Sequence, residues 1–164
     1  MSTDIINGLY EAFSNRDADA MGVFYSDDAQ FTDPVFGDLH GNEIRAMWAM
    51  LCSQADDLEV TWSGVTATGE SGSAHWEAVY TLTPSGRRVH NRIAAEFEFA
   101  DGVITRHVDT FDLWQWSKMA IGPMGSLLGW APPFKNKLRE TARRGLDRYV
   151  ERGDTANGTG DEAG

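Results

Sequence analysis

The sequence predicts an α+β domain in which helices come first and a curved antiparallel sheet follows. Before Leu58, apolar residues recur at three- and four-residue spacing, which is the period of an amphipathic helix. From Leu58 onward the chain changes to strand-length runs rich in Val, Thr, Trp, Tyr and Phe. A twisted sheet of this kind curls over the helices and can enclose a pocket.

Composition limits the kinds of protein this can be. The chain has 164 residues, 41% of them hydrophobic, which suits one domain. Its formal charge of −11 disfavours nucleic acids and anionic membranes as partners. Cys52 is the only cysteine, and the four histidines lack metal-binding spacing, so neither a metal nor another cofactor is expected. The N-terminus has no leader-like pattern and no apolar run is long enough to span a bilayer, which predicts a soluble, cytoplasmic protein.

Three helices are expected in the first part of the chain. The first covers residues 4–15, with Thr3 or Asp4 as N-cap, and a short second helix follows Asp17, also a capping residue. A strand around Asp33 and a loop containing His40 come next. The third helix follows Asn42, a favourable N-cap.

Four antiparallel strands are expected after the third helix. Gly- and Pro-containing turns separate them, and Asp101-Gly102 is a strong two-residue hairpin signal. The predicted strands cover residues 58–68, 73–83, 87–100 and 103–113.

The remainder of the chain is predicted to be helical. Residues 114–130 are expected to form short helical pieces, and a last helix follows Pro132-Pro133, with an apolar stripe that includes Leu138 and Leu146. Residues 1–152 then make one domain with a helical extension over 114–152, and residues 153–164 have too little apolar surface to be ordered.

Asp33 stands inside the apolar stretch Phe31-Thr32-Asp33-Pro34-Val35-Phe36. A buried carboxylate is costly unless it is paired, hydrogen-bonded or protonated, which makes Asp33 a candidate functional group. The alternative is structural, because Asp-Pro starts turns and the side chain can cap the local backbone.

A second candidate group lies on the last predicted strand. Alternation places His107, Asp109 and Phe111 on one face, together with Thr105. A carboxylate and an imidazole two residues apart can share a proton or orient a water molecule. The alternative is an ordinary polar pair at the end of a sheet.

Three segments resemble the nuclear transport factor 2-like superfamily. They are Asn15-Arg16-Asp17-Ala18-Asp19 with the following Phe24 to Ala29, then Phe31-Thr32-Asp33-Pro34, and Asp101-Gly102-Val103-Ile104 leading to His107-Val108-Asp109-Thr110-Phe111-Asp112. The superfamily includes SnoaL-like polyketide cyclases, ketosteroid isomerases and limonene-epoxide-hydrolase-like enzymes. The resemblance covers residues 4–116 and implies a cone that encloses an apolar cavity.

The resemblance also implies roles for single residues. Similarity to ketosteroid isomerases places Asp33 at the general base and Tyr10 near the oxyanion-hole tyrosine, while the second acid falls on Ala95. Similarity to the epoxide hydrolases makes Asp109 one of two catalytic carboxylates, with the remaining relay replaced by Trp76 and Ala78. Neither catalytic set is complete in this chain.

These expectations define a site. The catalytic candidates are Asp33, Asp109 and His107, acting without a cofactor or metal on a hydrophobic small molecule. The expected substrate-binding residues are Tyr10, Phe31, Trp48, Trp76, Tyr80, Phe97 and Phe111.

The favoured function is general acid/base catalysis, namely isomerisation, cyclisation or addition of water to an epoxide. The first alternative is a non-catalytic module of the same fold that binds a small molecule. A third possibility is an associative protein in which Trp114, Trp116 and the helix over residues 134–150 form a dimer interface. A homodimer is expected in any case.

Overall fold

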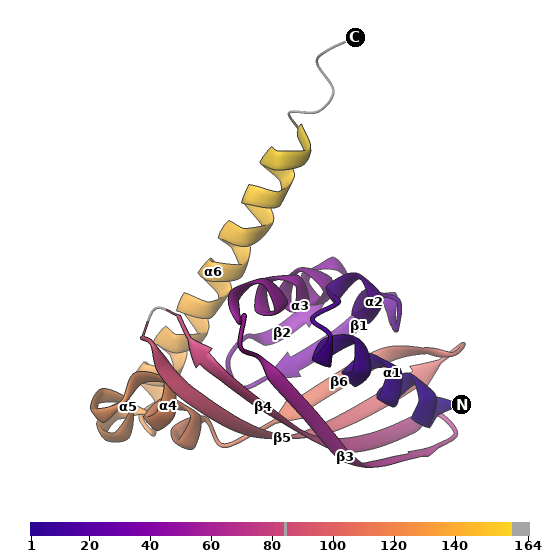
Figure 1. The fold of residues 1–164 in the computed structure, drawn as a ribbon, viewed down its shortest axis with the longest axis horizontal. Helices are drawn as coiled ribbons and strands as arrows, with labels where there is room; N and C mark the ends of the chain where they lie inside the picture. Colours follow the sequence, from indigo (N-terminus) through magenta and orange to yellow (C-terminus); the bar gives the residue numbers. More distant parts are fainter. Residues whose placement is uncertain (84, 159–164) are drawn as a thin grey trace.

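The computed structural model describes residues 1–83 and 85–158, and its centre is one curved six-stranded sheet with helices across one face (Figure 1). The strand order is β2-β1-β6-β5-β4-β3, and neighbours are antiparallel except for β1 beside β6, which are parallel. The predicted α+β fold is confirmed. The strands are β1 Tyr25–Asp33, β2 Gly37–His40, β3 Glu59–Thr68, β4 Ser71–Leu82, β5 Arg87–Ala100 and β6 Val103–Thr110.

The first three helices are α1 Ser2–Ser14, α2 Ala18–Gly22 and α3 Asn42–Gln54. The predicted cap of α2 is confirmed, because the Asp17 carboxylate accepts a hydrogen bond from the amide of Ala20 at 2.9 Å. The other predicted caps are wrong. Helix α1 begins at Ser2 after Met1, and α3 already includes Asn42, because Gly41 takes the preceding position with a φ of 52°.

Two predicted boundaries around the sheet are also wrong. His40 ends the short strand β2, which folds back on β1 as a hairpin, so it does not lie in a loop. Strand β6 stops at Thr110 because the Asp112 side chain accepts from the amides of Trp114 and Gln115 and starts the next helix. Local capping therefore overrides the strand pattern that extends to Leu113.

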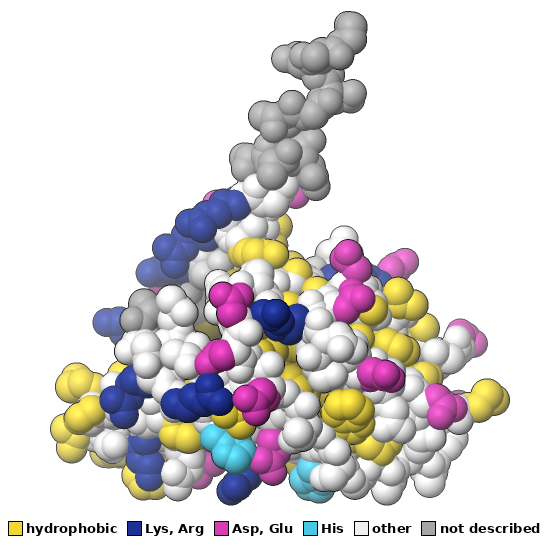
Figure 2. Space-filling view, in the orientation of Figure 1, with side chains coloured by type: hydrophobic (Ala, Val, Ile, Leu, Met, Phe, Trp, Pro, Cys, Tyr) yellow, Lys and Arg dark blue, Asp and Glu magenta, His cyan; other side chains and the backbone are white. Residues whose placement is uncertain are grey.

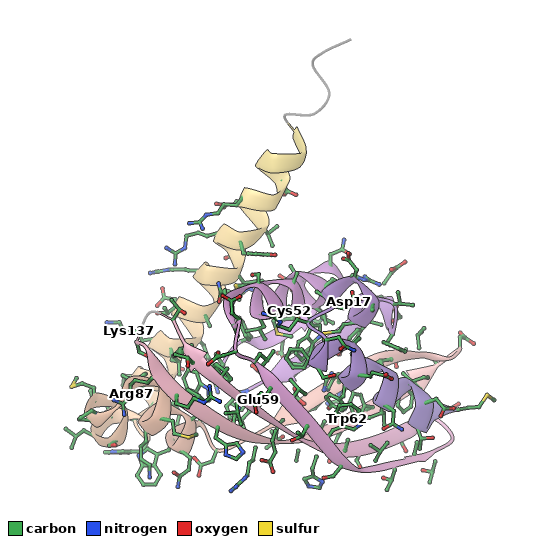
Figure 3. All side chains as sticks on the ribbon, in the orientation of Figure 1. Asp17, Cys52, Glu59, Trp62, Arg87 and Lys137 are labelled. Atoms are coloured by element: carbon green, nitrogen blue, oxygen red, sulfur yellow. The ribbon has the colours of Figure 1, made fainter. Side chains whose placement is uncertain are left out.

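The C-terminal extension consists of α4 Leu113–Ile121, α5 Pro123–Leu128 and α6 Pro132–Gly158. Short helices over residues 114–130 and a long last helix are therefore confirmed. Helix α4 is tied to the sheet by Arg87, whose Nε donates to the carbonyl of Met119 at 2.8 Å (Figure 3). The prediction of a disordered segment from Gly153 is wrong for residues 153–158, because an established helix extends at little cost per residue, and residues 159–164 lie outside the described part.

Helix α6 rises past α3 and is held against the domain by both packing and hydrogen bonds (Figure 1). Leu146 is 1% exposed and belongs to the main core. Arg139 donates to the carbonyl of Pro34 at 3.0 Å, and Arg143 donates to the carbonyl of Asp38 and to the carboxylate of Glu43. These contacts hold the helix against α3, β2 and the β1–β2 turn.

The side chains named for an associative interface differ in exposure, and Trp114 is 38% exposed. Trp116 is 8% exposed and Leu146 is buried inside the same chain, so neither is free to pack on a second copy. The exposed apolar side chains near them are on α4, on α5 and in the turn after α5, and Figure 2 shows hydrophobic side chains gathered at that corner of the molecule. No helix within the described ranges is both long and apolar enough to cross a membrane.

Replacing Leu146 with Ala tests whether α6 is part of the cooperative unit. Removing a fully buried leucine leaves a cavity, so we expect the free energy of unfolding to fall by about 2–5 kcal/mol in urea denaturation. Val150→Ala on the same helix, where the valine is 40% exposed, should change it by less than about 0.5 kcal/mol. Equal small effects of both changes would contradict the packing of α6 on the core.

Candidate functional site

A cavity of about 390 Å³ lies between the inner face of the sheet, α3 and α6. Its surface is mostly aromatic and aliphatic, and it contains two carboxylates, Asp33 from the end of β1 and Asp109 from β6. The aromatic residues that line it are Phe13, Phe31, Phe36, Trp48, Trp76, Tyr80, Phe111 and Trp116. Such a cavity suits an apolar small molecule that is oriented by a few polar groups.

Most of the predicted walls do line this cavity, among them Phe31 and Trp48. Trp76, Ala78 and Tyr80 stand at alternate positions on β4, and all three lie in the cavity wall. Trp116 and the α6 residues, including Leu138 and Ala142, were missed. No local pattern could have identified them, because the path of the extension across the cavity depends on tertiary packing.

Tyr10 and Phe97 were expected to contact the substrate, but the structure places both behind the cavity wall. Tyr10 is 1% exposed and packs behind Trp76, with ring centroids 5.7 Å apart. Phe97 packs on the imidazole of His107, with centroids 4.3 Å apart. Neither lines the cavity. Strand and helix periodicity predicts which face a residue is on, but not how deep in the core it lies.

Asp109 is the deeper of the two carboxylates and is 4% exposed. Its Oδ1 atom accepts hydrogen bonds from Trp76 Nε1 at 3.2 Å and from His107 Nε2 at 2.9 Å. Two N–H donors on one oxygen offset part of the cost of burying the carboxylate and fix its orientation.

A buried chain of hydrogen bonds supports His107 from behind. Trp48 Nε1 donates to Tyr25 Oη at 3.2 Å, and Tyr25 Oη lies 2.8 Å from His107 Nδ1. An indole N–H can only donate, so the tyrosine hydroxyl accepts from Trp48 and keeps its own proton available for Nδ1. In that arrangement the His107 proton is on Nε2, which donates to Asp109.

His107 is fully buried and does not line the cavity, and its Nε2 contacts Asp109, which does line it. Burial, followed by the charge of Asp109, raises the pKa of Tyr25 well above 10.0, which keeps the hydroxyl protonated. Tyr25 is not among the site residues predicted from the sequence, because its partner lies 82 residues away in the chain.

The predicted alternation on β6 holds at His107 and Asp109 and breaks at Thr105. Opposite Glu98 and Phe99 of β5, the pairing jumps from Arg106 to Ile104, so Thr105 is the extra residue of a β-bulge. Its hydroxyl donates to the carbonyl of Glu98.

Asp33 combines a structural and a chemical property. Its Oδ1 accepts from the amides of Val35 at 2.9 Å and Phe36 at 2.6 Å, so the side chain caps the β1–β2 turn. Burial nevertheless raises the pKa of Asp33 from 3.8 to about 7, and the charge of Asp109 contributes, while the turn amides lower it. Both predicted readings of this residue are therefore compatible with its surroundings.

Tyr80 places a hydroxyl in the cavity wall between these groups and the extension. Its Oη accepts from Trp116 Nε1 at 3.0 Å, so its own proton can be donated to a ligand. Burial raises the pKa of Tyr80, so this hydroxyl stays protonated at neutral pH. Among the described residues, no cluster of His, Cys, Asp and Glu side chains is arranged to hold a metal ion.

The SnoaL-like domain family matches residues 6–107, and the chain belongs to this family. Solved structures share its fold. A protein with a ketosteroid isomerase-like fold from Catenulispora acidiphila, in complex with trimethylamine, has a TM-score of 0.65 and 17% identity over 78% of this chain and 97% of its own. A comparison with curated proteins found no match.

Two enzyme-like structures are also similar. An LEH-like epoxide hydrolase from M. tuberculosis has a TM-score of 0.62 and 21% identity, covering 76% of this chain and 92% of its own. A proposed polyketide cyclase from Xanthomonas campestris has a TM-score of 0.58 and 25% identity, covering 72% of this chain and 95% of its own. The fold therefore belongs to the nuclear transport factor 2-like superfamily, as the sequence resemblance predicted.

Asp33→Asn tests the raised pKa through protein stability. Between about pH 4 and pH 7 the folded state keeps the Asp33 proton, whereas the unfolded state has released it. The wild type therefore loses stability as pH rises through this range. Asparagine keeps an oxygen for the turn amides but carries no charge. We expect the variant to exceed the wild type in unfolding free energy by an amount that grows from pH 4 to 7 and reaches at most about 4 kcal/mol.

Asp38→Asn, an exposed carboxylate on β2, is the matched control for that measurement. Its stability difference from the wild type should not grow in this way over the same range. If the stability difference between the wild type and Asp33→Asn were the same at pH 4 and pH 8, the raised pKa of Asp33 would be contradicted.

Tyr10→Phe tests the position of the Tyr10 hydroxyl. This group is buried and has no hydrogen-bond partner in the described part of the chain, so removing it should raise the free energy of unfolding by about 1 kcal/mol. Tyr25→Phe removes a hydroxyl with two partners and should instead lower it by about 1–3 kcal/mol. A destabilised Tyr10→Phe variant would show that the hydroxyl is satisfied after all.

Proposed function

We propose that this protein is an enzyme that transfers protons to and from an apolar small molecule in the cavity, with no cofactor. The reaction class is isomerisation, cyclisation or addition of water to an epoxide. One observation carries the proposal: two carboxylates share a cavity but stand in different environments, Asp33 against apolar groups and turn amides, Asp109 under two N–H donors. Environments that separate two acids in this way are typical of acid/base pairs.

Asp33 is the group that exchanges the proton. With a pKa of about 7, it is present in both protonation states at neutral pH and can act as a base and then as an acid within one turnover. The turn amides of Val35 and Phe36 hold the carboxylate in place. A fixed orientation of the carboxylate lowers the entropy cost of reaching a reactive geometry with the substrate.

Asp109 supports the reaction from the inner wall. Because Trp76 and His107 both contact Oδ1, the carboxylate is held in a fixed orientation at the cavity wall, where it can orient a water molecule or stabilise a developing positive charge. His107 and Tyr25 keep that geometry. Tyr80 supplies a hydrogen bond to a developing oxyanion in place of Tyr10.

This arrangement differs from both catalytic sets that the resemblance implied. Trp76 and Ala78 form apolar wall where the epoxide hydrolases have their relay, and Ala95 is buried beside Asp109 on the neighbouring strand. The proposal therefore uses the pair Asp33 and Asp109 and transfers neither relay. The homodimer, the cytoplasmic location and the single domain over residues 1–152 stay predictions from the sequence.

A non-catalytic binding module of the same fold is the second candidate. The observation that favours it is the cap formed by Asp33, because a carboxylate that serves its own turn has a structural reason to be present. In that case the cavity would hold an apolar ligand and leave its protons unchanged.

Deuterium exchange into 2-tetralone, an apolar ketone with acidic α-hydrogens, tests the catalytic proposal without knowledge of the natural substrate. We expect the wild type to accelerate exchange in D2O, with a rate that rises with pH through about 7 as Asp33 ionises. Asp33→Asn should reduce the enzymatic rate by about 10²- to 10⁴-fold, measured by mass spectrometry.

Asp38→Asn is again the matched control and should exchange at the wild-type rate. Full activity in Asp33→Asn would remove this carboxylate from the mechanism. Binding of the neutral dye N-phenyl-1-naphthylamine in the cavity, with no exchange catalysed by the wild type, would favour the binding module.

A further inference from the structure

The cavity carries negative charge that no basic side chain within it balances. Asp33 and Asp109 are among the lining residues, and in the described part of the chain no Lys, Arg or His lines the cavity with them. His107 lies behind Asp109, with Nε2 2.9 Å from Oδ1, and does not line the cavity. An apolar site with uncompensated carboxylates attracts a ligand that brings a positive charge.

The nearest basic side chains of α6 are directed to other partners. Arg139 is exposed and reaches the carbonyl of Pro34, while Arg143 is paired with Glu43 and the carbonyl of Asp38. Neither arginine lines the cavity. The charged group that contributes to the raised pKa of Asp33 is another acid, Asp109.

The walls suit a particular kind of cation. Trp48, Trp76, Trp116, Tyr80 and Phe31 bring aromatic rings to the cavity. Aromatic faces attract cations, and rings of this kind recognise alkylated ammonium groups, which lose little hydration when they are buried.

Hydrogen-bond capacity points to the same kind of ligand. Oδ1 of Asp33 already accepts from two amides, and Oδ1 of Asp109 accepts from Trp76 and His107. A primary ammonium has three N–H donors that need acceptors when it is buried, whereas a tertiary ammonium has one and a quaternary ammonium has none. An anionic ligand would be repelled by both carboxylates.

We propose that the cavity selects apolar molecules that carry a tertiary or quaternary ammonium group, seated between the aromatic walls and the two carboxylates. This names the ligand class of the site described under the proposed function. It rests on that cavity being a ligand site, and it does not depend on the site being catalytic.

Two probes of the same shape separate charge from hydrophobicity. N,N,N-trimethyl-2-phenylethylammonium and 3,3-dimethylbutylbenzene differ by a cationic nitrogen in place of a carbon, and 4-phenylbutyrate serves as the anionic comparison. Displacement of N-phenyl-1-naphthylamine from the wild type at pH 8 measures their affinities. We expect the cation to bind roughly 10- to 100-fold more tightly than the neutral isostere, and the anion to displace no dye.

The preference should depend on the two carboxylates. Asp33→Asn, which keeps an oxygen for the turn, should reduce the ratio of affinities by about tenfold, and Asp109→Asn should reduce it as well. Asp38→Asn should keep the wild-type ratio. Lowering the pH from 8 to 6 should weaken the cation preference of the wild type, since Asp33, which faces Asp109 and Tyr80, then gains a proton.

The outcomes separate this inference from the catalytic proposal. Equal or tighter binding of the neutral isostere overturns the inference, because hydrophobicity alone favours that probe, and failure of the dye and all probes to bind overturns it too. Deuterium exchange without a cation preference overturns the inference alone. A cation preference without any exchange overturns the catalytic proposal alone.

Discussion

A carboxylate among aromatic rings must be hydrogen-bonded, and much of the interior of this protein meets that requirement for Asp109. Trp76 and His107 donate to it directly, and Tyr25 and Trp48 fix the proton on the imidazole. These residues come from β1, α3, β4 and β6, so the helices and the sheet must dock correctly before the chain of hydrogen bonds can close. One buried charge thus couples the correct assembly of the fold to the chemistry of the cavity.

At Asp33, the hydrogen bonds to the carboxylate do not outweigh the effect of burial on its pKa. Its turn amides stabilise the charged form, yet burial and the nearby Asp109 outweigh them and raise its pKa to about 7. The two acids therefore differ, because donors hold Asp109 in a fixed orientation, whereas Asp33 can change its protonation state near neutral pH. The raised pKa of Asp33 lowers the stability of the folded protein above pH 7, because the buried Asp33 carboxylate is then charged and water would solvate it better. Functional sites often carry such a cost in stability.

The fold could be predicted because its signals are local and periodic. The Asp17 cap, the alternation on β4 and the Asp101-Gly102 hairpin each act within a few residues. The site could be predicted only in part. The pairing of Tyr25 with His107 depends on contacts between distant segments, and the recession of Tyr10 behind Trp76 depends on packing depth, which no periodicity encodes. The wall formed by α6 depends on how a separate extension docks, which the preceding strands do not specify.

The family match stops at His107, two residues before Asp109, and it includes none of α4, α5 or α6. Yet Trp116 and Leu138 close one side of the cavity and Trp116 positions Tyr80. The sheet and the first three helices of this chain therefore form a trough, and the C-terminal extension closes one side of it. The shape of the cavity depends on that extension as well as on the sheet, so a change in α4 or α6 would alter the space for a ligand while the sheet stays the same.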